Sequence, residues 1–263
     1  MTGSATDAPA VATRPALEAV ELSLGFGAVT VLRSVSVQIE HGTIFALLGP
    51  TGSGKSTFLR SLNRMNDKVP GFHRDGQVLL EGESIYAGRG DLMDLRRRIG
   101  MLFQRPNPFP MSIAQNVVAG VRAHKMAARR DLAGIARQRL EQVGLWDAVK
   151  DRLGDSPFRL SGGQQQLLCL ARALAVEPEV LLLDEPTSSL DPVSTEAIEA
   201  LIRSLAPQLT VVIVTHNLRQ AQRVADHTAF FHDGRLVEHG PTAQLFGSPA
   251  EAETARYIAG ALG

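Results

Sequence analysis

Residues 49–57 read GPTGSGKST and restrict the fold more than any other segment of this chain. The preceding residues 43–48, TIFALL, are almost wholly apolar, which predicts a strand inside a buried sheet. The following residues predict a helix that begins at Lys55 and ends near Met65. The glycine-rich turn therefore joins a buried strand to a helix, and in that context the pattern G-x-x-x-x-G-K-[ST] binds the phosphates of a nucleotide.

The residue types in this turn suit a triphosphate, which needs many backbone N–H donors around it. Gly52 and Gly54 let the backbone wrap closely around such a group. A helix N-terminus stabilises a bound anion by only about 0.3–1 kcal/mol, which is too little to hold a nucleotide. Lys55 is therefore expected to place a positive charge on the outer phosphates, and Ser56 to act as a Mg²⁺ ligand. The alternative is a glycine-rich turn that binds nothing. The predicted phosphate-binding residues are Gly49, Pro50, Thr51, Gly52, Ser53, Gly54, Lys55, Ser56 and Thr57.

Two carboxylates end a second apolar strand, VLLLDEP at residues 180–186. Beside a phosphate-binding loop, Asp184 is predicted to hold Mg²⁺ directly or through water. Glu185 is then placed to orient or deprotonate the water that attacks the nucleotide. Taken alone, Asp-Glu-Pro would be only a strand that ends at a turn.

Two further polar residues follow apolar strands and are predicted to border the same crevice. His216 closes TVVIVTH at residues 210–216 and could hydrogen-bond the terminal phosphate. Gln104 follows the apolar residues 99–103 and could sense Mg²⁺ or the attacking water. Without the other motifs, each would be an ordinary residue at a strand end or on the surface.

The order of elements predicts an α/β fold. Strands alternate with helices on both sides of residues 106–160, which implies a mainly parallel sheet covered on both faces. Residues 106–160 instead have helical periodicity, for example at Leu132, Ile135 and Leu140, and predict an inserted helical subdomain that Gly144 helps to end. Strand patterns fill residues 17–40, and hairpin turns are expected at residues 81–82 and 233–234. Residues 1–15 read as a disordered tail and residues 16–263 as one ATPase domain.

Composition excludes several classes of protein. The 27 Lys and Arg residues balance the 27 Asp and Glu residues, so no positive field favours nucleic acid. We expect no secretory leader, and no apolar stretch approaches the roughly 18 residues of a membrane span. The single cysteine, Cys169, fits a reducing cytosol and a small buried side chain. Any work at a membrane must therefore depend on a partner.

Residues 160–164 read LSGGQ, and on physical grounds alone they are a helix start capped by Ser161. Together, GPTGSGKST, Gln104, LSGGQ, VLLLDEP, SSLD and His216 stand in the order found in ABC transporter ATPases, and the chain resembles that family over nearly all of residues 17–263. The resemblance implies a P-loop NTPase (RecA-like) core, an antiparallel β subdomain and a helical subdomain. It also implies ATP and Mg²⁺ as cofactors.

The resemblance further implies a head-to-tail homodimer in which the phosphate-binding loop of one copy and LSGGQ of the other enclose each ATP. Ser161, Gly162, Gly163 and Gln164 would thus act on the nucleotide of the partner copy. Asp191 in SSLD would communicate across the dimer, and Gln104 would report to membrane subunits. Phe26 stands where an aromatic ring usually stacks on adenine.

Four shorter sequence segments resemble the phosphate-import branch of this family. They are LNRMND at 62–67, RPNPFPMSI at 105–113, LAVEPEVLLLDEP at 174–186 and TARYIAG at 254–260. This branch implies import of inorganic phosphate through two transmembrane permease subunits, with an extracytoplasmic phosphate-binding protein acting through them. It also places the chain at the cytoplasmic face of the cell membrane. An importer ATPase for an amino acid or another oxyanion remains an alternative. Leu167 departs from the family, which commonly has Arg there.

Two other hypotheses come from different classes. A soluble ABC protein that acts on DNA or ribosomes would usually have a long coiled coil, a second cassette or a basic surface, and none is visible here. A regulator that binds nucleotide without hydrolysing it would be expected to lack Glu185 or His216, and both are present.

Overall fold

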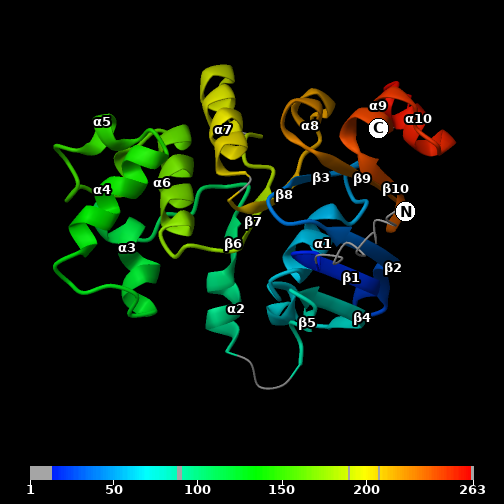
Figure 1. Ribbon diagram of the computed structural model, residues 1–263, viewed down its shortest axis with the longest axis horizontal. Coiled ribbons are helices and arrows are strands. Elements are labelled where there is room, and N and C mark those ends of the chain that lie inside the picture. The colour runs from blue at the N-terminus through cyan, green and yellow to red at the C-terminus, as the bar shows by residue number, and fades with distance from the viewer. Residues whose placement is uncertain (1–13, 88–90, 189, 207, 262–263) are drawn as a thin grey trace, which may run out of the picture.

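The computed structural model describes residues 14–87, 91–188, 190–206 and 208–261. Most of the predicted tail, residues 1–13, lies outside the described residues. The described chain contains a mainly parallel sheet, a smaller antiparallel sheet and a group of helices that projects to one side (Figure 1). The predicted α/β class and its three structural parts are therefore confirmed.

The central sheet has the strand order β10-β9-β3-β8-β7-β6. Strands β9, β3, β8, β7 and β6 are parallel neighbours, and only β10 runs antiparallel, to β9. Helices separate the parallel strands in sequence, as such crossovers require. Its strands are β3 (Ile44–Leu48), β6 (Ile99–Leu102), β7 (Val180–Asp184), β8 (Thr210–Val214), β9 (His227–His232) and β10 (Arg235–Pro241).

The antiparallel sheet has the order β2-β1-β4-β5. Its strands are β1 (Leu17–Phe26), β2 (Val29–Ile39), β4 (Phe72–Leu80) and β5 (Glu83–Ser84). Both predicted hairpin turns are present, with left-handed φ angles at Glu81 (55°) and Gly82 (78°) and at Asp233 (46°) and Gly234 (73°). Two successive residues with positive φ give the tight turn that matches strand twist.

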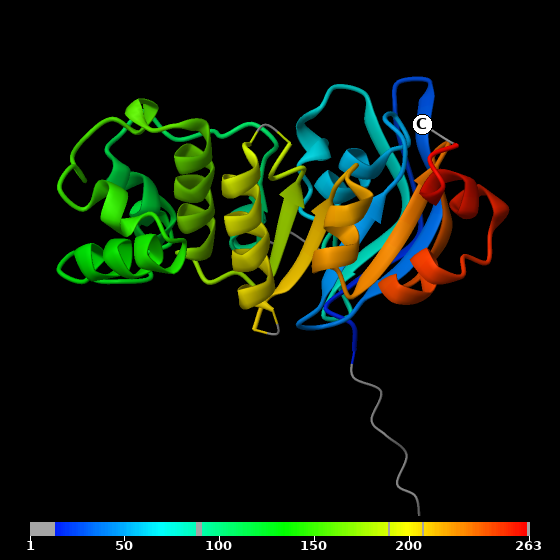
Figure 2. The same ribbon diagram turned by 90° about the horizontal axis from the view of Figure 1, so that it is seen from above.

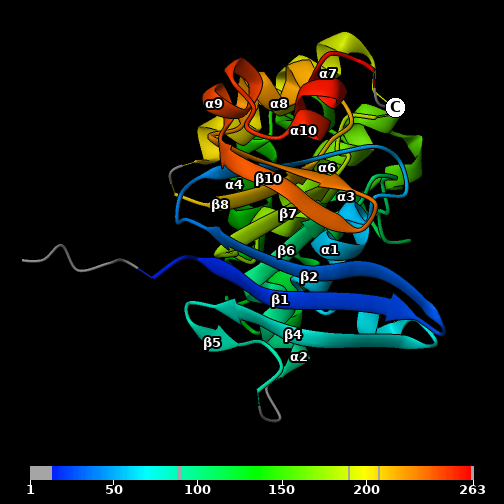
Figure 3. The same cartoon turned by 90° about the vertical axis from the view of Figure 1, so that its right-hand side faces the viewer.

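The buried strands of the central sheet divide their side chains between two cores. Phe45 and Leu47 pack with α1 (Lys55–Ser61) and the antiparallel sheet. Ile44, Ala46 and Leu48 pack on the opposite side, with α6 (Gly162–Leu174) and other helices. The alternation of side chains along a strand explains this division. Figure 3 shows the central sheet between the antiparallel sheet and helices α8, α9 and α10.

The remaining helices cover the sheet or form the projecting group, which Figure 2 shows at one end of the molecule. They are α2 (Leu92–Arg98), α3 (Ile113–Ala123), α4 (Leu132–Gln142), α5 (Trp146–Val149), α7 (Pro192–Leu205), α8 (Leu218–Val224), α9 (Thr242–Gly247) and α10 (Ala252–Ile258). Gly144, with φ of 71°, follows α4 as the sequence predicts. Over the ranges described, no helix has the length and apolar character needed to cross a membrane.

Helix α1 is shorter than the sequence predicts, because it ends at Ser61 and not near Met65. The cause is Arg64, whose φ of 59° is incompatible with a continuing helix. Its guanidinium bonds to Asp67 at 2.9 Å and so supports the turn that follows.

Helix α6 shows how the chain accommodates Leu167 and Cys169. Leu167 packs against the apolar core of the helical side. Cys169 is buried there as expected, and burial raises the pKa of its thiol. The departure at Leu167 therefore adds apolar contact on this helix.

The proline-rich residues 106–112 depend on one buried side chain, Asn116 of α3. Its amide accepts from the backbone N–H of Phe109 at 2.7 Å and donates to the carbonyls of Phe109, Met111 and Ser112 at 3.0–3.2 Å. A loop without strand or helix partners needs such bonds for its buried polar groups.

We expect Asn116→Ala to lower the free energy of unfolding by about 2 kcal/mol, because the loop backbone would lose its hydrogen bonds to a buried side chain. Urea denaturation followed by circular dichroism measures this loss. Arg130→Ala changes a side chain that is 88% exposed and is the matched control, expected within about 0.5 kcal/mol of wild type. Equal stability of both variants would show that the loop does not need Asn116.

Candidate active site

The predicted phosphate-binding loop and four of the predicted polar residues meet at one edge of the central sheet. The phosphate-binding loop (residues 49–57) follows β3, Glu185 follows β7, His216 follows β8 and Gln104 follows β6. The register aligns these ends: Leu47 pairs with Val214, Val214 with Asp184, and Leu183 with Leu102. Residues that are distant in sequence therefore share the carboxyl edge, where open parallel sheets bind ligands.

The phosphate-binding loop requires glycine at defined positions. Gly49 has φ of 143° and Gly54, the residue before α1, has φ of 97°. A Cβ at Gly49 would overlap the carbonyl oxygen of Phe231, and one at Gly54 would lie 2.5 Å from a methyl carbon of Leu32. The loop thus combines left-handed backbone with close packing, which only glycine permits.

Lys55 is only 6% exposed, and its ammonium lies inside this loop. It donates to the carbonyls of Gly49 at 2.8 Å and Pro50 at 2.7 Å, and to the hydroxyl of Ser53 at 3.3 Å. Burial lowers the pKa of Lys55, and the nearby carboxylates of Glu185 and Asp184 oppose this fall. The loop therefore concentrates one positive charge close to two acidic side chains.

Asp184 is the most buried acid of the site, at 2% exposure. The hydroxyl of Ser56 donates to its Oδ1 at 2.8 Å, and the Nη2 of Arg60 donates to its Oδ2 at 2.9 Å. Ser56 and Arg60 are four residues apart on α1, so they share one face of the helix. A buried carboxylate without such partners would be strongly unfavourable.

This pair of oxygens fits a magnesium ion. Mg²⁺ prefers hard oxygen ligands and usually takes one or two from protein and the others from phosphates and water. Ser56 and Asp184 offer a hydroxyl and a carboxylate beside the phosphate-binding loop. No group of three or more His, Cys, Asp or Glu side chains suited to a metal occurs among the described residues.

Glu185 stands at a strained turn with φ of 46°. Its carboxylate oxygen Oε2 lies 3.2 Å from the Nδ1 of His216 and accepts from the Nε2 of Gln104 at 3.2 Å. The same Gln104 amide donates to Ser188 at 3.3 Å. A non-glycine residue with such a φ is rare and is found most often where function requires it. The side chains of Glu185, His216 and Gln104 therefore form one polar cluster.

A cavity of about 330 Å³ connects these parts, and its wall includes Glu185 and His216. The loop contributes Thr51, Gly52, Gly54, Lys55, Ser56 and Thr57, and β2 contributes Val31. Phe26 does not line this cavity within the described chain; its ring packs on Phe72 with centroids 5.6 Å apart.

Residues 160–164 form the start of α6, where Ser161 and Gln164 cap the helix reciprocally at 3.2 and 3.3 Å. Asp191 caps α7 through the backbone and hydroxyl of Ser194, at 3.0 and 2.6 Å, which lower the pKa of its carboxyl. A Cβ at Gly163 would lie 3.0 Å from the Ser194 hydroxyl, so the two helix starts adjoin. Neither start lines the cavity at the phosphate-binding loop, as far as the described residues show.

Two site residues were missed by sequence reasoning. Arg60 could have been found from its four-residue spacing to Ser56. Val31 has no such signal, because it reaches the cavity only through the packing of the antiparallel sheet on the phosphate-binding loop. Gln166 adds an unexpected link between α6 and the segment that carries Gln104. Its amide donates at 3.0 Å to the carbonyl of Phe103, the residue before Gln104.

The phosphate-binding loop, the acidic end of β7 and the capped LSGGQ helix together define an ATPase of the ABC type. The ABC transporter family model matches residues 32–188. Phosphate import ATP-binding protein PstB 2 of Mycobacterium tuberculosis (strain ATCC 25618 / H37Rv) is 67% identical over 252 residues, covering 96% of this chain and 91% of that protein.

Two solved structures agree with this assignment. cbiO1 from Clostridium perfringens, part of the ABC transporter complex cbiONQ, has a TM-score of 0.76 at 27% identity and covers 93% of this chain and 95% of that one. The ATP-binding cassette MJ0796, a dimer bound to ADP and Pi, has a TM-score of 0.75 at 27% identity, covering 86% and 98%. The chain therefore belongs to the ABC transporter family, among its phosphate import ATP-binding proteins.

We expect Lys55→Ala to weaken ATP binding about ten- to a hundredfold, because hydrogen bonds to a charged group are worth about 1.5–3 kcal/mol. Titration calorimetry with ATP measures the change. Lys68→Ala removes an exposed lysine just after α1 and is the control, which should bind like wild type. An unchanged affinity of the Lys55 variant would exclude the proposed contact.

Proposed function

We propose that this chain hydrolyses ATP to power the import of inorganic phosphate through an ABC transporter. The observation that carries the ATPase part is the contact of Glu185 with Gln104 and His216 beside the phosphate-binding loop. The phosphate part is supported by the 67% identity to a phosphate import ATP-binding protein over 96% of the chain. Import of an amino acid or another oxyanion has no such support.

In this proposal, Lys55 and the amides of residues 49–57 bind the outer phosphates of ATP. The buried ammonium would exchange its contacts with loop carbonyls for contacts with phosphate oxygens. Ser56 and Asp184, with Gln104 at the edge of the site, would hold Mg²⁺, which neutralises negative charge on the phosphates.

Glu185 acts as the general base for the attacking water and receives its proton at a carboxylate oxygen. His216 and Gln104 lie within 3.2 Å of that carboxylate, so they can orient both the base and the water. His216 also lines the cavity and can hydrogen-bond the terminal phosphate.

ATP hydrolysis in this proposal needs two copies of the chain. The start of α6, with Ser161, Gly162, Gly163 and Gln164, presents backbone N–H groups to a nucleotide but lies outside the cavity of its own copy, as described. These residues would close over the ATP of the second copy, and Asp191 would contact that copy from the adjoining helix start. Phe26 would meet adenine with one face of its half-buried ring.

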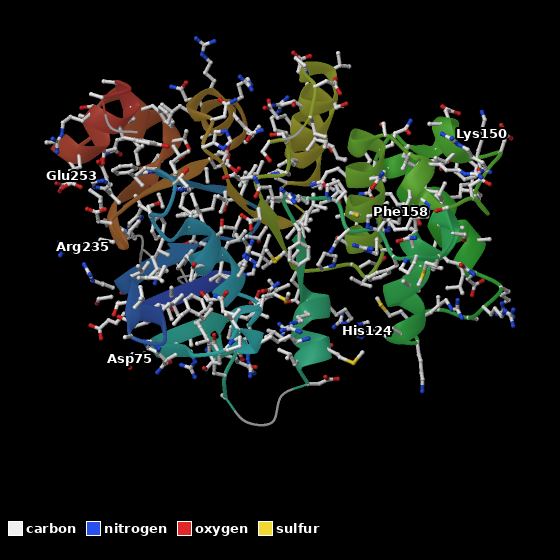
Figure 4. The ribbon with its side chains drawn as sticks, turned by 180° about the vertical axis from the view of Figure 1, so that it is seen from behind. Asp75, His124, Lys150, Phe158, Arg235 and Glu253 are labelled. Atoms are coloured by element: carbon white, nitrogen blue, oxygen red, sulfur yellow. The ribbon has the colours of Figure 1, made fainter. Side chains whose placement is uncertain are left out.

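The proposal places the chain at the cytoplasmic face of the cell membrane, held by two permease subunits. An extracytoplasmic phosphate-binding protein would act through those permeases, and no nucleic acid is involved. Exposed apolar side chains offer a contact surface for the permeases. Phe109, five residues after Gln104, is 42% exposed, and Phe158, just before LSGGQ, is 59% exposed. Figure 4 shows Phe158 on the helical side, away from Arg235 and Glu253.

We expect Glu185→Gln to bind ATP, to lower kcat by about 10²–10⁴-fold and to accumulate as an ATP-bound dimer, because the amide cannot accept the proton. Steady-state phosphate release and gel filtration with ATP measure these effects. Glu196→Gln, at an exposed position of α7, is the matched control and should hydrolyse normally. Normal hydrolysis by the Glu185 variant would refute its role as base.

The transported solute is tested by phosphate uptake in cells that lack this gene. Wild type should restore high-affinity uptake, and Glu185→Gln should not, because uptake needs hydrolysis. If uptake never depends on the gene, the phosphate assignment is wrong and the ATPase assignment still stands.

A further inference from the structure

A buried polar group outside the residues discussed so far joins α7 to α8. Glu199 of α7 is 2% exposed and Gln220 of α8 is 1% exposed. Arg223 binds Glu199 with two bonds, from Nε at 2.9 Å and from Nη2 at 2.7 Å. Burial alone would raise the pKa of Glu199, but the bonds from Arg223 and Gln220 outweigh it and lower the pKa. Glu199 is thus a fixed carboxylate in the protein interior.

Gln220 connects this group to the turn that begins at Glu185, residues 185–188. Its Nε2 donates to Glu199 Oε1 at 3.1 Å and to Thr187 Oγ1 at 2.8 Å. An amide nitrogen carries two protons, so each acceptor receives one. Thr187 lies two residues after Glu185, whose left-handed φ of 46° makes the turn dependent on its surroundings.

The same residue also supports the His216 side of the site. Helix α8 begins after Asn217, and the side chain of Asn217 accepts from the backbone N–H of Gln220 at 3.1 Å. Gln220 therefore lies on the helix that follows His216 and bonds to the turn that follows Glu185. Its hydrogen bond to Thr187 spans the same two segments as the contact of 3.2 Å between His216 and Glu185.

The bond from Gln220 to Thr187 matters because open space adjoins the turn after Glu185. A second cavity, of about 780 Å³, is lined by Glu185, Thr187, Glu199, His216 and Arg223, among others. The turn after Glu185 thus has room to move toward this cavity, and the bond that the buried Gln220 donates to Thr187 opposes that movement.

We propose that Gln220, itself held by Glu199, is a positioning residue that fixes the Glu185 turn against His216 through Thr187. This inference rests on the proposed ATPase function. A displacement of about 1 Å at a reacting group can cost on the order of 10²-fold in rate. The P-loop residues that bind ATP make no hydrogen bond to this group in the described structure, so ATP binding should not depend on it.

The test compares Gln220→Met and Thr187→Val, which remove opposite ends of one hydrogen bond while nearly keeping side-chain volume. Each should lower kcat about ten- to a hundredfold and leave KM for ATP within about threefold, since catalysis and not binding is affected. The double variant should be no slower than the slower single variant, because both changes break the same bond. Thr187→Ser keeps the hydroxyl and should retain nearly full kcat.

Gln222→Met is the matched control, since Gln222 lies on the same helix and is exposed. All variants are assayed as the full chain for ATP hydrolysis, and titration calorimetry measures ATP binding. If Gln220→Met fails to fold, Thr187→Val still tests the same hydrogen bond, because Thr187 is only half-buried.

Three outcomes would overturn the inference: an unchanged kcat in both single variants, losses that multiply in the double variant, or equal losses in kcat and ATP affinity. The last would mean that the group only supports the nucleotide site as a whole. Failure of the proposed function is distinct, because wild type would then hydrolyse no ATP or Glu185→Gln would remain active.

Discussion

The parallel alignment of β3, β8, β7 and β6 is the constraint on which the whole site depends. Neighbouring strands lie about 4.8 Å apart, and their hydrogen bonds leave little freedom along the strand direction. Once the register is set, the loop after β3, His216 after β8, and Asp184 and Glu185 at β7 must lie side by side. Gln104 joins them from β6. A one-residue slip would turn each buried side chain to the other face and separate these groups.

Burial on both faces of the sheet explains where polar side chains can stand. Strands β3, β7 and β8 are buried along their full length, so charged groups are confined to their ends. Two buried charged side chains of the site each have fixed partners: Lys55 has loop carbonyls, and Asp184 has Ser56 and Arg60. The loop therefore holds its charges ready for phosphates, which reduces the reorganisation needed when charge develops in the reaction.

Much of this arrangement could be predicted from sequence, because local patterns determine it. Apolar runs identified β3, β7 and β8, and the paired turn residues identified both hairpins. The end of α1 could not be predicted, since the left-handed φ of Arg64 has no sequence signal of the kind that glycine gives. The bond from Gln220 to Thr187 joins residues 33 apart in sequence, and only the packing of α8 near the end of β7 reveals it. Long-range hydrogen bonds of this kind have no periodicity to read.

Helix α7 joins the two ends of the site into one structure. Asp191 caps its start beside Gly163 of α6, and Glu199 in its middle receives Gln220 and Arg223. A helix of 14 residues is about 21 Å long and moves largely as a unit. The start of α7 adjoins LSGGQ. The middle of α7 is linked to Thr187 through Gln220, which bonds both Glu199 and Thr187. The position of Glu185, the proposed general base, and the placement of the LSGGQ helix therefore share a single support.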